Sequence, residues 1–179
     1  MKTTILKLMY AMLLILIATF ISCKGETGPA GADGKDGVDG QNGNANVISS
    51  AWVNPTWTVP ATHASFDVTT SLITQEIADN GVILVYMKTS QAIYPLPISF
   101  TNVPNPNSFQ FRVNVGSITI WFDAQDAYEP SSVQFRYVII PASTSNKSAN
   151  PQQEILYRLD KAGIDVNNYY QVMDYFGLE

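Results

Sequence analysis

The segment SFQFRVNV at 108–115, followed by Gly116-Ser117 and by ITIWFDA at 118–124, determines the fold expected for this chain. Apolar and polar residues alternate through both runs, which is the period of a β-strand with one buried face. The glycine and serine between the runs have the composition of a turn. The two runs therefore predict an antiparallel hairpin, in which Ile118, Ile120 and Phe122 share one face and Thr119, Trp121 and Asp123 share the other.

Further strands are expected on both sides of this hairpin, at 47–53, 65–70, 82–89, 97–101 and 133–140. VILVYM at 82–87 is apolar on both faces, which favours a central strand. Prolines lie between the runs, where they interrupt no ladder. We predict a mainly β fold, an antiparallel β-sandwich of about seven strands over residues 46–142. TQEIADNG at 74–81 predicts one or two helical turns, ended by a left-handed cap at Asn80-Gly81.

Residues 143–179 are expected to form a polar connector and a short C-terminal helical tail. EILYRL at 154–159 predicts a helix, with an edge strand as the alternative. Asp165 or Asn167 is suited to cap a second helix, and Gly177 to end it. This second helix has an apolar stripe at i, i+3, i+4 and i+7, formed by Tyr169, Val172, Met173 and Phe176. The stripe is expected to pack on the sandwich, with a partner-binding face as the alternative.

Residues 1–22 predict an export signal. Lys2 and Lys7 precede an apolar run at 8–20 that is short for a membrane-spanning helix. The run leads into Phe20-Ile21-Ser22-Cys23, which resembles a bacterial lipobox with Phe in place of the usual Leu. The resemblance implies cleavage before Cys23 and acylation of its thiol, and several acyl chains anchor a protein stably. An ordinary thiol at Cys23 and a retained membrane anchor are the alternatives.

Glycine occupies every third position from Gly25 to Gly43, through seven triplets. This period is that of collagen, in which only glycine fits at the axis of three wound chains. The segment 23–45 therefore predicts a stalk that would extend roughly 65 Å in a homotrimer. Pro29 is the only proline of the repeat, so a flexible tether averaging about 25 Å is the alternative.

The charge of the chain argues against nucleic acid as a partner. The sequence has 10 Lys and Arg against 15 Asp and Glu, and residues 1–22 contain two of the lysines and no acid. Cleavage therefore leaves 8 basic and 15 acidic side chains, a net charge of −7. A chain of this charge offers no basic stripe to neutralise phosphates.

Few residues point to chemistry. His63 is the only histidine and no nucleophile motif accompanies it, so we expect neither an enzyme nor a cofactor. DAQDAYEP at 123–130 is expected to be a loop, and its Asp123, Asp126 and Glu129 are candidate calcium ligands. A solvated connecting loop is the alternative.

Aromatic side chains are the second candidate site. Trp121, Trp52 and Trp57 are candidates for a flat platform on which sugar rings stack. Trp121 is the best placed for exposure because it shares a strand face with polar residues. Packing in the core or between sheets is the alternative, since aromatic residues are favoured in strands.

Most of residues 20–142, together with the C-terminal segment DVNNYYQVMDYFGL, resembles a group of Bacteroidota lipoproteins with collagen-like repeats. The resemblance is carried by the lipobox cysteine, the glycine repeat ending in GNANV, and three later segments: ITQEIADNGVILVYMKT with YPLP, VGSITIWF with FRYVIIP, and DVNNYYQVMDYFGL. It implies attachment to the outer membrane through Cys23, and it implies no reaction. Only Glu26 is acidic directly after Cys23, which leaves periplasmic and cell-surface orientations open.

The sequence thus predicts a lipid-anchored, non-enzymatic protein of the cell envelope, with a structural or protein-interaction role. The alternative function is a glycan-binding surface module that uses exposed aromatic side chains.

Overall fold

The computed structural model describes residues 3–5, 7, 9, 46–130, 132–142 and 149–178. The chain divides after Gly40, and every described strand belongs to the unit Gln41–Glu179. Cys23 and the glycine repeat lie outside the described residues, as does most of the predicted export signal. Within the described ranges, no helix has the length and apolar character needed to cross a bilayer.

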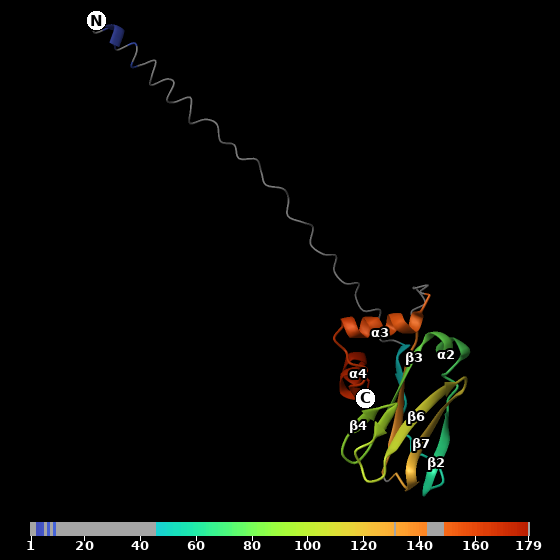
Figure 1. Cartoon of the computed structure of the whole chain (residues 1–179). Helices are drawn as coiled ribbons and strands as arrows, with labels where there is room; N and C mark the ends of the chain where they lie inside the picture. Colours follow the sequence, from blue (N-terminus) through green and yellow to red (C-terminus); the bar gives the residue numbers. More distant parts are fainter. Residues whose placement is uncertain are drawn as a thin grey trace. The chain divides into compact units, whose positions relative to one another are not determined.

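The described residues form two antiparallel sheets of four strands each (Figure 1). One, the β3 sheet, has the order β1 (Ile48–Ser49), β8 (Gln134–Ile140), β3 (Val82–Lys88), β4 (Ile93–Pro95). The other, the β7 sheet, has the order β2 (Ala61–Thr69), β7 (Ser117–Tyr128), β6 (Asn107–Asn114), β5 (Ile98–Phe100). The prediction of a mainly β, antiparallel fold is confirmed, with eight strands in the described part of the chain.

The hairpin that opened the sequence analysis lies at the centre of the β7 sheet. Asn114 pairs with Ser117 across the turn, so β6 and β7 are joined as predicted. Gly116 has a φ of 83°, which favours glycine because it has no Cβ. The alternation of the hairpin directs Phe109 and Phe122 inward, and both are almost completely buried.

The two sheets pack face to face through aromatic rings. The ring of Phe135 in β8 lies 5.6 Å from that of Phe66 in β2 and 6.4 Å from that of Phe109 in β6. These rings belong to one continuous apolar core that both sheets contribute to. Each fully buried aromatic or aliphatic side chain of this kind contributes about 1.5–3 kcal/mol to folding.

The outer face of the β3 sheet is covered by two C-terminal helices, α3 (Pro151–Lys161) and α4 (Tyr169–Phe176) (Figure 1). Leu159 of α3 and Val172 of α4 form a second core with Val82 and Tyr86 of β3. Strand β3 is therefore buried on both faces, as its apolar run indicated. The edge-strand alternative for 154–159 is wrong, and the apolar stripe of the second helix packs on the sheet as expected.

Two predicted helix caps differ from those in the structure. Helix α4 is capped by the side chain of Asn168, which accepts a hydrogen bond from the amide of Gln171, and not by Asp165 or Asn167. Gly81, after α2 (Gln75–Asn80), has an extended backbone with φ −84° and not a left-handed one. The chain enters β3 directly at this glycine. A Cβ there would lie 2.8 Å from the Ile77 carbonyl oxygen, so glycine is needed for close approach.

Candidate functional site

The outer face of the β7 sheet carries polar side chains around one tryptophan. Successive side chains of a strand alternate between faces, so the neighbours of the buried residues point outward. The register aligns these outward residues in three rows across β2, β7 and β6: Ser65–Trp121–Gln110, His63–Asp123–Ser108 and Asp67–Thr119–Arg112. We call these nine residues the Trp121 face.

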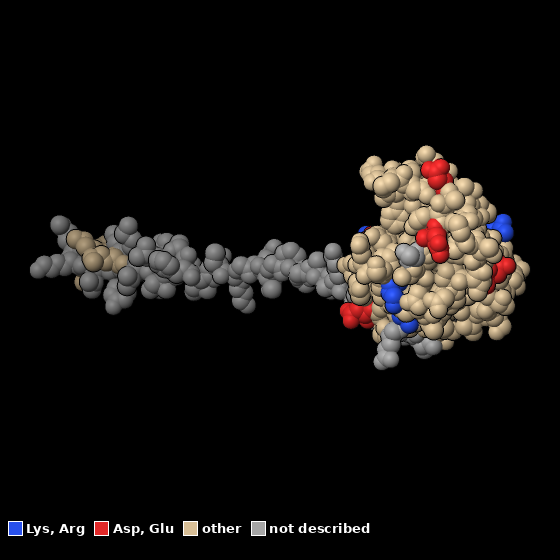
Figure 2. Space-filling view, turned by 90° about the horizontal axis from the view of Figure 1, so that it is seen from below, with Lys and Arg blue, Asp and Glu red and all other residues tan. Residues whose placement is uncertain are grey.

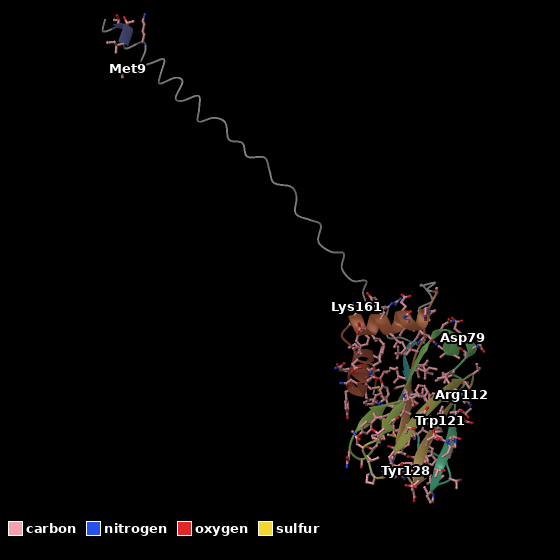
Figure 3. All side chains as sticks on the ribbon, in the orientation of Figure 1. Met9, Asp79, Arg112, Trp121, Tyr128 and Lys161 are labelled. Atoms are coloured by element: carbon pink, nitrogen blue, oxygen red, sulfur yellow. The ribbon has the colours of Figure 1, made fainter. Side chains whose placement is uncertain are left out.

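Trp121 is the large apolar side chain in the middle row of this face. It is half-buried, between the exposed Ser65 and the half-buried Gln110. None of the aromatic ring pairs in the described ranges includes Trp121. Because the residue is only half-buried, part of its surface remains accessible to another molecule. Figure 3 labels Trp121 together with Arg112, which lies on the neighbouring strand β6.

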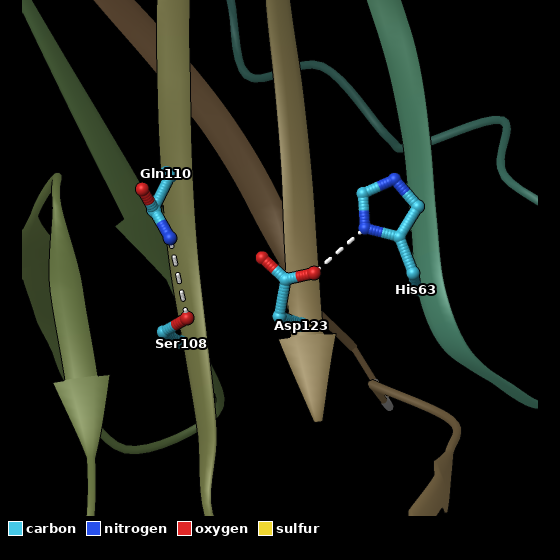
Figure 4. A network of polar contacts seen from close by, with 4 residues as sticks. All are labelled: His63, Ser108, Gln110 and Asp123. Atoms are coloured by element: carbon cyan, nitrogen blue, oxygen red, sulfur yellow. Dashed lines mark hydrogen bonds and ion pairs between the residues drawn. The ribbon is translucent and has the colours of Figure 1, made fainter. Parts of the chain in front are cut away.

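On one side of Trp121, the polar side chains are joined by hydrogen bonds (Figure 4). His63 Nδ1 donates to Asp123 Oδ1 over 2.7 Å, and the two side chains are 58% and 50% exposed. Gln110 Nε2 donates to Ser108 Oγ over 3.5 Å, which is a long and weak bond. The second oxygen of Asp123 and the amide oxygen of Gln110 keep free acceptor positions in the described structure.

On the other side of Trp121, Thr119 links two strands. Its hydroxyl donates to Asp67 Oδ1 over 2.6 Å and accepts from Asn114 Nδ2 over 3.1 Å. Within the described residues, no hydrogen bond or ion pair engages the guanidinium of Arg112. The two rows beside Trp121 therefore present two carboxylates, those of Asp67 and Asp123, and one cationic donor, the guanidinium of Arg112.

The structure does not bring the three candidate tryptophans together. Trp57 packs between the sheets, with its ring 5.0 Å from that of Phe122 and 5.7 Å from that of Phe135. Trp52 lies on the other side of the β3 sheet, where its ring is 5.5 Å from that of Tyr169. Of the three, only Trp121 lies on a sheet face that neither the other sheet nor a described helix covers, so a platform of all three is not formed.

Trp52 is held in a cluster that joins both ends of the folded unit. Lys88 Nζ lies 4.8 Å from the centre of its ring and Arg136 Cζ lies 5.5 Å from it, which are cation–π distances. Arg136 also donates to the Ser50 carbonyl oxygen and to the Tyr169 hydroxyl, each over 2.6 Å. These contacts give Trp52 a structural role between the first strand and α4.

The three candidate calcium ligands do not lie in one loop. Strand β7 continues to Tyr128, so Asp123 and Asp126 are strand residues and only Glu129 follows the strand. The backbone N–H and C=O of Asp126 pair with the side-chain amide of Asn105, which extends the sheet and was not foreseen from the sequence. In the described part of the chain, no three His, Cys, Asp or Glu side chains gather in a way that could hold a metal ion.

The contact between His63 and Asp123 was not predicted from the sequence. His63 lies on β2 and is exposed, but its pairing with a residue sixty positions away depends on the register of two strands.

The folded unit shows no concentration of one charge sign on the side drawn in Figure 2, where acidic and basic side chains are dispersed.

Comparison with protein families, with curated proteins and with solved structures finds no match to this chain.

Proposed function

We propose that this chain is a lipid-anchored, non-enzymatic protein of the bacterial envelope, attached to the outer membrane through Cys23. Three sequence features support the anchor: the apolar leader, the single cysteine directly after it, and the absence of any other cysteine that could pair with it. The glycine repeat then separates Cys23 from the first strand by about 24 residues, as a trimeric stalk or as a flexible tether.

The folded unit serves to bind another molecule, and one observation carries this role. The outer face of the β3 sheet is covered by α3 and α4, whereas the outer face of the β7 sheet bears a half-buried tryptophan in the middle of hydrogen-bonding side chains. A large aromatic side chain held partly open among polar groups is typical of recognition surfaces. The Trp121 face is therefore the binding surface in this proposal.

A catalytic role for the same face has less support. His63 and Asp123 form an exposed pair on the outer face of the β7 sheet, and Ser65 lies two residues from His63 without a hydrogen bond to it in the described structure. A serine nucleophile is activated by contact with its base, and Ser65 makes no such contact with His63 in the described residues.

The anchor is tested by growing cells that make the full chain with an alkyne-labelled fatty acid. We expect label on the unaltered protein and on Lys24→Ala, the matched control, and none on Cys23→Ser. Label that persists in Cys23→Ser, or an unaltered protein without label, would contradict the proposal. Sedimentation of the unlipidated protein separates the stalk from the tether, because only the stalk requires a trimer.

A further inference from the structure

We propose that the Trp121 face binds a neutral polysaccharide, with one pyranose ring stacked on the indole of Trp121. This inference rests on the proposed interaction role and specifies the ligand class for the same surface. Four properties of the face lead to it: the isolated indole, the polar rows on both sides, the small net charge and the position of Trp121 outside the two best-defined hollows.

The indole matches the apolar side of a sugar ring. A pyranose has a face of C–H groups and a rim of hydroxyls, so it needs an apolar flat partner and hydrogen-bonding groups around it. Trp121 is half-buried, which fixes its ring while leaving part of it open. Its neighbours across the strands are the small Ser65 and the amide Gln110, and neither is a large apolar side chain.

The rows on both sides of Trp121 match the hydroxyl rim. Residues two apart on a strand are separated by about 7 Å, so the flanking rows lie within reach of the substituents of one stacked ring or its neighbour in a chain. Asp67 and Asp123 supply carboxylate acceptors for sugar hydroxyls, and Arg112 supplies donors. The carboxylates are already oriented by Thr119 and His63, which lowers the entropy cost of binding.

The charge of the face favours a neutral ligand over a charged one. Its two carboxylates are opposed by the guanidinium of Arg112, so with His63 neutral the nine residues carry a net charge of only −1. The chain after Cys23 is acidic overall, with 8 basic against 15 acidic side chains, which would repel a polyanion such as an acidic glycan or a nucleic acid.

The shape of the face favours a polymer over a small molecule. The two best-defined hollows among the described residues lie elsewhere, one in the core beside Ile118 and one of about 280 Å³ beside Gly81 and Leu156, and Trp121 lines neither. A sugar ring stacked on a sheet face outside these hollows can extend at both ends into a chain. One stacked ring with a few exposed hydrogen bonds gives a Kd on the order of 1 mM, so binding would gain strength from several copies on one membrane.

The test uses the chain without residues 1–23, which retains the whole unit Gln41–Glu179. The protein is run on native gels containing dextran, mannan, xyloglucan or mixed-linkage β-glucan, and on a gel containing the polyanion alginate. The variants are Trp121→Ala, Trp121→Phe and the control Tyr170→Ala, which removes an aromatic ring that is 70% exposed on α4. Thermal unfolding of each variant establishes that it is folded.

We expect at least one neutral polysaccharide to slow the migration of the protein in the gel. Trp121→Ala should weaken the affinity derived from this retardation about tenfold, as expected for loss of a stacking contact. Trp121→Phe should retain part of it and Tyr170→Ala all of it. Retardation by none of the neutral polymers, by alginate alone, or equally in folded Trp121→Ala would overturn the inference. None of these results bears on the acylation of Cys23, so the proposed anchor and the proposed ligand class are tested independently.

Discussion

The hydroxyl of Tyr86 provides a sharp test of how the C-terminal helices are attached to the β3 sheet. Tyr86 is fully buried, and its hydroxyl donates to the carbonyl oxygen of Val166, just before α4, over 2.8 Å. Its ring also lies 5.2 Å from that of Tyr169. Tyr86→Phe keeps the ring and removes only the hydroxyl, so the packing of the second core is preserved.

The expected cost of Tyr86→Phe follows from this one bond. A hydrogen bond contributes about 1 kcal/mol net, and leaving the half-buried Val166 carbonyl without its donor adds to this, so we expect a loss of about 1–2 kcal/mol at pH 7. Urea unfolding measures it as a lower midpoint with an unchanged slope. Tyr170→Phe is the matched control, because Tyr170 is exposed and its substitution should leave the midpoint unchanged.

The same substitution has a second signature at high pH. Burial raises the pKa of Tyr86 well above its ordinary value of 10, and Asp165 and Tyr169 raise it further. The folded state therefore keeps a proton that the unfolded chain loses, so this contribution to stability is complete below pH 10 and is lost as the pH rises above 10. The unaltered protein should lose up to about 1.4 kcal/mol per pH unit from this group, and Tyr86→Phe should not.

The difference in stability between the two proteins should accordingly shrink between pH 9.5 and pH 11. Equal midpoints at pH 7, together with parallel losses of stability above pH 10, would refute the burial and hydrogen bonding assigned to Tyr86. A difference that Tyr170→Phe reproduces would refute them as well.

Three further substitutions test local features, each by urea unfolding. Gly81→Ala should cost about 1–3 kcal/mol, because the added Cβ would lie 2.8 Å from the Ile77 carbonyl oxygen; a neutral result would mean that this junction relaxes freely. Asn168→Ala should cost about 1 kcal/mol through loss of the α4 cap, and Asn168→Asp should restore most of it; a failure to restore would point away from capping. His63→Ala should cost less than about 1 kcal/mol, since its pair with Asp123 is exposed; a larger loss would show that this pair supports the sheet.

The sequence was sufficient to predict features that depend on local periodicity. Alternation assigned Ile118, Ile120 and Phe122 to the core and Trp121 to the outer face, because a strand has only two faces. The apolar run of β3 likewise predicted burial on both sides, since no exposed position interrupts it. The i, i+3, i+4 stripe of α4 predicted its packing face for the same reason.

Features that depend on which strands meet were not predictable in this way. Trp52, Trp57 and Trp121 were candidates for one platform, yet they lie on three different layers of the structure. The backbone of Asp126 in β7 bonds to the side chain of Asn105, twenty-one positions earlier, and the end of β7 pairs with Ala61 of β2. The extended backbone at Gly81 follows from its direct entry into β3, whereas the Asn-Gly sequence alone favoured a left-handed cap.

Attachment to the membrane through Cys23 is the premise on which the proposed role depends, and intact mass spectrometry of the protein from the cells that make it tests it most directly. We expect a chain that begins at Cys23 and is heavier than its sequence by the mass of a diacylglyceryl group and an amide-linked acyl chain. A chain with an unmodified thiol, or one that still carries residues 1–22, would contradict the proposal.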